Sequence, residues 1–281
     1  ISTPELSTTA PTLTPIQNHI NPTPAITATL TATPNAEEEP VNFQGALIDG
    51  VDWYVLIQDA STNQTIFELN PNTPFPPASM IKVPTALAVL SILEDQGRTL
   101  DDLKAYGISG RNFNSLLEAM IVRSEESATD ALEYFARGGN QLRVKLDSWG
   151  LTNTKYDPRV STAAELLTSL RLLNTNTVLT AENSQFLLTL MGTYTENDHI
   201  LLGKLTEALP DCVFLNKRGT MLRPTIASDM GILRCGEHSW YLVVAGTPAA
   251  DSTATFEDIQ ASIETFALTL AQFVRQQLTQ P

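Results

Sequence analysis

The segment PASMIK, residues 77–82, stands at the start of a predicted helix and carries a serine and a lysine three positions apart. Side chains at i and i+3 lie on one face of a helix, so Ser79 and Lys82 are expected to be neighbours. A neutral lysine amine can take the proton of a serine hydroxyl and make it a nucleophile. The amides of a helix N-terminus also stabilise a developing oxyanion. Because S-x-x-K also arises by chance, the rest of the chain must decide what this segment means.

The flanking sequence predicts one antiparallel sheet built from both ends of the chain. The predicted elements are strands at 51–59 and 65–69, helical segments over 76–93 and 112–191, strands at 212–216, 226–233 and 240–245, and a helix over 256–277. The strands are rich in β-branched and aromatic residues, which favours sheet. We therefore expect an α+β fold, an α/β sandwich whose antiparallel sheet is flanked by terminal helices and carries an inserted all-helical subdomain.

The first 40 residues have a composition unlike the rest of the chain. They contain 10 Thr and 7 Pro, with no glycine, aromatic or basic residue. Such a segment cannot form a core, so we expect a disordered tether over residues 1–42. Thr/Pro-rich stalks are typical of exported proteins held at a cell surface, and a trimmed cytosolic tail is the alternative. Any signal peptide or lipid anchor is expected to have been removed or to lie outside these residues.

The remainder, residues 43–281, is predicted to be one domain. We expect its sheet subdomain at about 43–75 and 205–281, and its helical subdomain at about 76–204. The apolar fraction of the whole chain, 42%, is large enough for a substantial core.

Composition also excludes several classes of function. The 17 basic and 31 acidic residues give a net charge of −14, which excludes a general nucleic-acid binder. No apolar run is long enough to predict a membrane span. His19, His199 and His238 lie far apart without ligand spacing, so we expect no zinc site, no other metal and no cofactor. A monomer is expected.

A second polar segment, Ser124-Glu125-Glu126, separates two predicted helices. Such a break can present a hydroxyl into a cleft, where Ser124 would relay protons between Ser79, Lys82 and a leaving group. The alternative is ordinary capping, with Ser124 as N-cap and the two acids in the first turn.

A third segment, Lys217-Arg218-Gly219-Thr220, lies on a predicted strand. A lysine on an edge strand can hold a substrate carboxylate, and Gly219 would let a substrate backbone approach closely. The amides of Thr220 and Ser79 would then form an oxyanion hole. The alternative is a charged strand end that leads into the turn near residue 223.

Together, the three segments resemble those of the serine β-lactamase and penicillin-binding protein superfamily, and the class A β-lactamases fit best. The resemblance runs from the first predicted strand to the end of the chain. Ser79 matches the family nucleophile, Lys82 its paired lysine and Ser124 the serine of the S-D-N motif, while Lys217 and Gly219 match the K-T-G motif. The resemblance implies catalytic roles for Ser79, Lys82, Ser124 and Lys217.

The chain departs from this family at three places. The loop that carries the deacylating glutamate is shortened to residues 150–161 and contains no glutamate. Asp157-Pro158 is a weak counterpart of the family's Glu-Pro pair, and its carboxylate as a replacement base is the less favoured alternative. Glu126 replaces the asparagine that contacts the substrate amide, and an ionised carboxylate only accepts hydrogen bonds. Arg218 replaces a small hydroxyl residue, where it would either bind a substrate carboxylate or block the cleft. We also hypothesise that Glu126 and Arg218 pair across the cleft.

A hairpin that turns near residues 223–224 would place opposed residues at positions that sum to about 447. Arg218 then faces Asp229, which would give a cross-strand ion pair, and Cys212 faces Cys235 within reach of a disulfide. A disulfide would agree with export, and two buried free thiols are the alternative.

These observations predict an exported serine hydrolase that forms an acyl-enzyme on Ser79 with a small-molecule β-lactam or a related amide or ester. Hydrolysis of that acyl-enzyme lacks an evident general base. A cell-wall D,D-peptidase or esterase acting on cell-wall peptides is one alternative. A non-catalytic binding domain of the same fold is another, which the changed charges at Glu126 and Arg218 favour.

Overall fold

The computed structural model describes residues 40–193 and 199–279 and confirms the predicted α+β class. Most of the predicted tether, residues 1–39, lies outside the described residues. The helices are η1 Gln44–Ala46, η2 Ala78–Ile81, α1 Lys82–Asp95, α2 Asp102–Ala105, α3 Phe113–Ile121, α4 Glu126–Arg137, η3 Gly138–Asn140, α5 Gln141–Ser148, α6 Ala163–Asn174, α7 Ala181–Met191, η4 Leu201–Lys204, α8 Leu205–Ala208 and α9 Phe256–Thr279. The strands are β1 Val51–Asp59, β2 Thr65–Leu69, β3 Gly107–Ile108, β4 Arg111–Asn112, β5 Lys155–Tyr156, β6 Arg159–Val160, β7 Val213–Leu222, β8 Thr225–Cys235 and β9 His238–Pro248.

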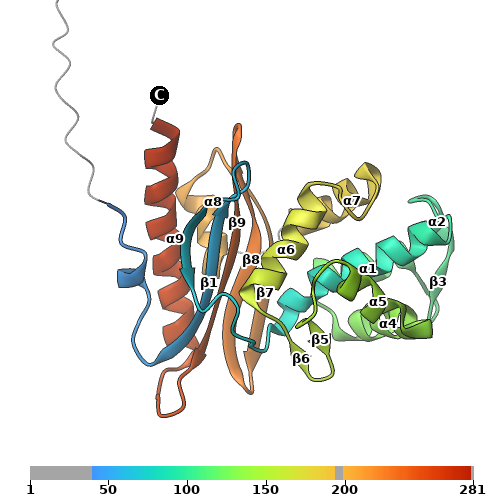
Figure 1. Cartoon of the computed structure of the whole chain (residues 1–281), viewed down its shortest axis with the longest axis horizontal. Helices are drawn as coiled ribbons and strands as arrows, with labels where there is room; N and C mark the ends of the chain where they lie inside the picture. The colour runs from blue at the N-terminus through green and yellow to red at the C-terminus, as the bar shows by residue number, and fades with distance from the viewer. Residues whose placement is uncertain (1–39, 194–198, 280–281) are drawn as a thin grey trace, which may run out of the picture. The chain divides into compact units, whose positions relative to one another are not determined.

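A five-stranded antiparallel sheet in the order β2-β1-β9-β8-β7 forms the centre of the domain. The pairing of β1 with β9 joins the first strand of the chain to the last, as the sequence predicts. Helix α9 covers one face of the sheet, and the helical segment from α1 to α7 lies on the other face (Figure 1). Strand β7 is an edge strand beside η2, where the chain enters the helical segment.

Two hydrophobic cores lie on opposite faces of this sheet. One core packs Met230, Tyr241 and neighbouring sheet residues against the helical segment. The other packs Trp53 and further sheet residues against Phe266 and the rest of the buried face of α9. The sheet is covered on both faces, which is why its central strands read as nearly continuous apolar runs.

The β7–β8 hairpin has the predicted register, with Lys217 opposite Met230 and Arg218 opposite Asp229. Both strands extend to the turn at residues 223–224, beyond the boundaries that hydrophobicity predicts. A disulfide joins Cys212 to Cys235 at the other end of the hairpin, with an S–S distance of 2.05 Å.

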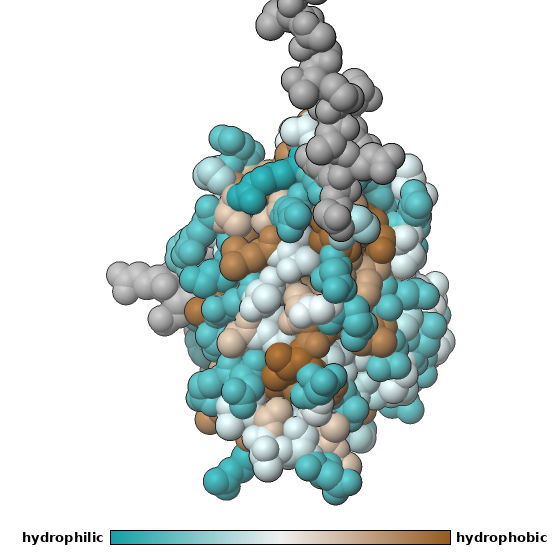
Figure 2. All heavy atoms as spheres, turned by 90° about the vertical axis from the view of Figure 1, so that its left-hand side faces the viewer, coloured by the Kyte–Doolittle hydropathy of each residue, from teal (hydrophilic) through white to brown (hydrophobic). Residues whose placement is uncertain are grey.

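Two short hairpins, β3–β4 and β5–β6, are not apparent from the sequence. The second occupies the shortened loop and contains a cis Asp157–Pro158 bond. Figure 2 shows the outer surface on the side of the molecule where α9 lies, and hydrophobic residues lie there in small groups among polar ones. In the described ranges, none of the helices combines the length and hydrophobicity that a membrane crossing requires.

Candidate active site

Ser79 lies on the 3-10 helix η2, directly before α1. Side chains at i and i+3 of a 3-10 helix eclipse each other, which places Ser79 and Lys82 on one side of the chain. Pro84 fits the first turn of α1, where an amide has no intrahelical partner. Ala78 has a φ of +47°, a left-handed conformation that costs a non-glycine residue energy. The backbone is therefore bent immediately before the serine.

Ser124 lies in the link between α3 and α4, also in a left-handed conformation with a φ of +55°. The N-cap of α4 is Glu125 and it makes no side-chain cap hydrogen bond, so Ser124 is not the capping residue that the alternative interpretation expected. Its hydroxyl and its carbonyl oxygen both accept hydrogen bonds from Lys82. The strained link thus turns Ser124 toward the start of α1.

Lys82 is fully buried, and its ammonium group has three acceptors. Its Nζ lies 2.7 Å from the Ser124 carbonyl oxygen, 3.0 Å from Ser124 Oγ and 2.5 Å from Glu126 Oε1. Burial lowers the pKa of Lys82, while the hydrogen bond and charge of Glu126 act against this effect. Lys82 therefore connects Ser124 to a carboxylate.

A network of charges continues from Lys82 to the β5–β6 hairpin. Arg159 of β6 donates to Glu126 Oε2 at 2.8 Å and to Glu133 Oε1 at 3.3 Å, and it also faces Asp130. Burial would raise the pKa of Glu126, but the hydrogen bonds from Lys82 and Arg159 hold it below its ordinary value. Burial raises the pKa of Glu133. Glu126 is thus an ionised carboxylate between two cations.

The facing wall of the site is β7, which packs directly on η2. A Cβ atom at Gly219 would lie 2.5 Å from Ser228 Oγ and 2.7 Å from the Pro77 carbonyl oxygen. The glycine therefore permits close packing of β7 on the segment that carries Ser79. The backbone that approaches Gly219 is therefore that of Pro77, whereas the sequence led us to expect the backbone of a substrate.

A buried polar pair supports β7 from the side of β8. The Asp229 carboxylate is inaccessible to solvent and accepts hydrogen bonds from Asn216 Nδ2 at 3.0 and 3.1 Å. Burial raises the pKa of Asp229 to about 7, although Asn216 and the charges of Arg218 and Lys217 act to lower it. Asn216 itself lies beside Lys217 and lines the site.

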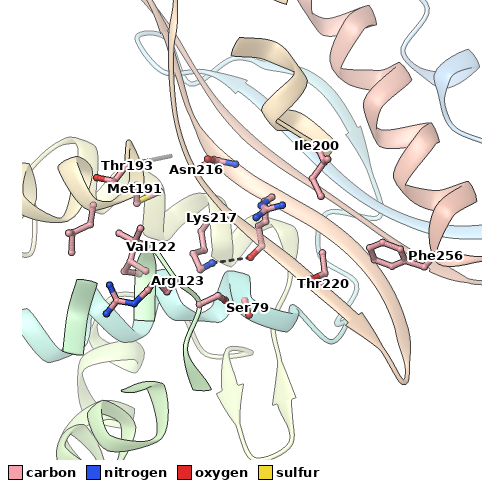
Figure 3. Close-up of a pocket in the computed structure, with 14 residues that line it drawn as sticks. Ser79, Val122, Arg123, Met191, Thr193, Ile200, Asn216, Lys217, Thr220 and Phe256 are labelled. Atoms are coloured by element: carbon pink, nitrogen blue, oxygen red, sulfur yellow. Dashed lines mark hydrogen bonds between the residues drawn. The ribbon is translucent and has the colours of Figure 1, made fainter. Parts of the chain in front are cut away.

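A cavity of about 470 Å³ separates the two walls (Figure 3). Its lining comprises Ser79, Ile121, Val122, Arg123, Ser124, Leu190, Met191, Thr193, Ile200, Asn216, Lys217, Arg218, Thr220 and Phe256. Figure 3 shows Lys217 reaching from β7 toward Ser79, with Thr220 farther along the strand. Lys217 is buried, and its Nζ lies 3.4 Å from the Arg218 carbonyl oxygen. Among the described residues, the Ser79 hydroxyl has no hydrogen-bond partner.

The structure thus brings Ser79, Ser124 and Lys217 to one cavity and places Lys82 in contact with Ser124. Thr220 also lines this cavity. Among the described residues, the ion pairs of Glu126 are with Lys82 and Arg159, whereas we hypothesised a pair with Arg218 across the cleft.

Sequence reasoning missed Arg159 and Glu133. Arg159 follows the Asp157–Pro158 bond in the shortened loop, and the neighbouring residues do not indicate its partners. Tyr156 of the same hairpin was also missed, and its hydroxyl bonds to Thr85 of α1 at 3.1 Å. In residues 40–193 and 199–279, no group of three or more His, Cys, Asp or Glu side chains could hold a metal ion.

The comparisons with known proteins agree with this fold. The family model described as the beta-lactamase enzyme family matches residues 45–273. No curated protein matches the chain. Among solved structures, the TLA-1 extended-spectrum β-lactamase is similar with a TM-score of 0.67 and 18% identity, over 83% of this chain and 96% of that chain.

Two further solved structures are similar. PBP-A has a TM-score of 0.67 and 16% identity, over 83% of this chain and 94% of that chain. A putative class A β-lactamase, PenP from Rhodopseudomonas palustris, has a TM-score of 0.65 and 21% identity, over 80% and 94%. At these identities, the likeness establishes the shared fold.

Proposed function

The chain belongs to the beta-lactamase enzyme family, and from that premise we propose that it is a serine hydrolase that forms an acyl-enzyme on Ser79. Its substrates would be β-lactams or related amides and esters. One observation carries the proposal: Ser79, Ser124 and Lys217 line the same cavity, and buried Lys82 contacts Ser124. These four residues provide a nucleophile, a proton relay and a cation for a substrate carboxylate.

The proposed reaction begins when Ser79 Oγ attacks the substrate carbonyl carbon. The proton of Ser79 moves toward Lys82, and the oxyanion is stabilised by the amides of Ser79 and Thr220. Collapse of the tetrahedral intermediate breaks the carbon–nitrogen bond, and Ser124 delivers a proton to the leaving nitrogen. Lys217, with Arg218 and Gly219 beside it on β7, would bind the carboxylate of the substrate.

Intact-mass measurement after incubation with benzylpenicillin tests this proposal. We expect an adduct equal to the mass of the antibiotic on the native protein and no adduct on the Ser79→Ala variant. A stable adduct would mean that deacylation is slow. Consumption of the antibiotic without an adduct, dependent on Ser79, would mean that the protein is a β-lactamase with turnover. No adduct and no consumption would refute the reaction with β-lactams.

A D,D-peptidase or esterase acting on cell-wall peptides is the second candidate. It is favoured by the shortened loop at 150–161, which lacks the glutamate that the family uses for deacylation. A solved structure of a PBP-A variant, which has a similar fold, is described as an acyl-enzyme complex with penicillin G. Hydrolysis of a peptide ending in D-Ala-D-Ala by the native protein, and its loss in Ser79→Ala, would support this candidate.

Export is part of the same proposal. The Cys212–Cys235 disulfide favours an oxidising compartment, because disulfides are rare in reducing cytosol. The Thr/Pro-rich segment would then act as a tether at the cell surface.

A further inference from the structure

We propose that Glu126 is the proton acceptor of this site and that it acts through Lys82. The inference rests on the function proposed above and concerns its acylation step, for which the sequence suggested Lys82 alone as the base. It also gives Glu126 a role different from the substrate contact that the sequence suggested.

The contacts of Lys82 are the first argument. An ammonium group has three protons, and Lys82 Nζ has three acceptors: two oxygens of Ser124 and Oε1 of Glu126. A lysine that donates all three protons has no lone pair with which to take a fourth. Before Lys82 can accept the proton of Ser79, it must therefore release one of its own. Among its three acceptors, the Glu126 carboxylate is the most basic, and it lies only 2.5 Å from Nζ.

The position of Glu126 is the second argument. Arg159 holds Oε2 from the opposite side at 2.8 Å, which leaves Oε1 directed at Lys82. The half-exposed Glu126 side chain thus bridges a buried amine and the surface. The other charged groups near this bridge are Glu133 and Asp130, both facing Arg159. Arg159 therefore positions Glu126, while Lys82 exchanges protons with it.

The proposed transfers balance over the acylation step. The Ser79 hydroxyl proton moves to Lys82 Nζ as one proton of Nζ moves to Glu126 Oε1, and the Ser79 oxygen bonds to the carbonyl carbon. When the carbon–nitrogen bond breaks, the Ser124 hydroxyl proton passes to the leaving nitrogen. Lys82 replaces the proton of Ser124, and Glu126 returns its proton to Lys82. Ser124 Oγ lies 3.0 Å from Nζ, which makes this return path direct.

The test compares the acylation rate constant with benzylpenicillin in four proteins: native, Glu126→Gln, Glu126→Asp and Glu125→Gln. Glutamine keeps the size of the side chain and its acceptor oxygen but cannot take a proton. Glu125→Gln is the matched control, because that carboxylate pairs with Arg111 at 2.5 Å. We expect Glu126→Gln to acylate at least about 100-fold more slowly than the native protein at pH 7, since acid–base groups contribute about 10²–10⁴-fold. Glu126→Asp should retain much of the rate, and Glu125→Gln should react like the native protein.

The pH profile separates a proton acceptor from a residue that merely holds Lys82. The native rate constant should stay level as the pH falls from 8 to 5, because Lys82 and Arg159 hold the pKa of Glu126 below its ordinary value. In Glu126→Gln the rate constant should instead rise with pH, because Lys82 must then lose its proton to solvent.

Two outcomes overturn the inference in different ways. If native protein and Glu126→Gln acylate within threefold of each other with the same pH profile, Glu126 only positions Lys82, and the proposed function stands. If the native protein forms no adduct and consumes no antibiotic, the reaction with β-lactams itself fails. Melting temperatures of all four proteins show whether each variant is folded.

Discussion

At the scale of single residues, the most unusual group outside the cavity is Asp229. Its buried carboxylate accepts hydrogen bonds from Asn216 Nδ2. The ion pairs of the described residues do not include the predicted one between Asp229 and Arg218. Burial raises the pKa of Asp229 from 3.8 to about 7. Between these values the folded protein binds a proton that the unfolded chain has released. The contribution of Asp229 to stability is therefore largest at acidic pH and falls as the pH rises to about 7.

We expect the melting temperature of the native protein to fall between pH 5 and pH 8 by several degrees more than that of Asp229→Asn. The amide of asparagine keeps the shape and does not ionise. Asp101→Asn serves as the control, because the Asp101 side chain is 95% exposed. Thermal unfolding at both pH values provides the measurement. Equal falls in the native protein and Asp229→Asn would contradict the prediction.

At the scale of elements, the packing of β7 on η2 sets the distance between the two walls of the site. At Gly219 the two segments approach closely, because an added Cβ would lie 2.7 Å from the Pro77 carbonyl oxygen. We expect Gly219→Ala to cost about 1–3 kcal/mol of stability, because the added methyl group meets backbone that cannot move freely. The added methyl group should also push β7 away from η2. We expect this shift to slow acylation, because Lys217 and Thr220 would move relative to Ser79.

Gly138→Ala is the matched control for this change, because a Cβ at Gly138 meets nothing within 4 Å. Chemical denaturation and the acylation rate constant are the two measurements. If Gly219→Ala is as stable as the native protein and acylates at the native rate, β7 and η2 tolerate a larger separation, and the prediction is wrong.

Elements with a strong local signal were predictable, and those that depend on distant partners were not. The boundaries of β1 and β2 agree with prediction because their own residues favour strand. Hydrophobicity alone marks β7 only to Asn216, and the polar Lys217–Thr220 segment was assigned to the strand from its motif. Its pairing with β8 holds that segment in the sheet.

The same reason limits prediction of the site. Ser79 and Lys82 are joined by local spacing, so their proximity follows from sequence. The contact between Glu126 and Arg159 joins α4 to β6, and no local pattern in either segment indicates it. Charge at position 126 was visible in the sequence, but its partners were not.

At the scale of the whole molecule, the Cys212–Cys235 disulfide closes the hairpin that carries one wall of the site. The two cysteines are separated by 23 positions. Closing a loop of this length restricts the unfolded chain and stabilises the folded protein by about 3 kcal/mol. We expect the Cys212→Ser/Cys235→Ser protein to melt below the native protein. A reducing agent should lower the native melting temperature and leave the variant unchanged. Identical melting of the two proteins without reductant would contradict this.

The pairing of β1 with β9 has a consequence for synthesis on the ribosome. Ser79, Lys82 and Ser124 leave the ribosome long before β7 and its lysine, and β9 follows last of the strands. In the order β2-β1-β9-β8-β7, only β9 connects the early hairpin to the late one. A nascent chain that ends before β9 therefore carries all the proposed catalytic residues and lacks the strand that brings their two walls into one sheet.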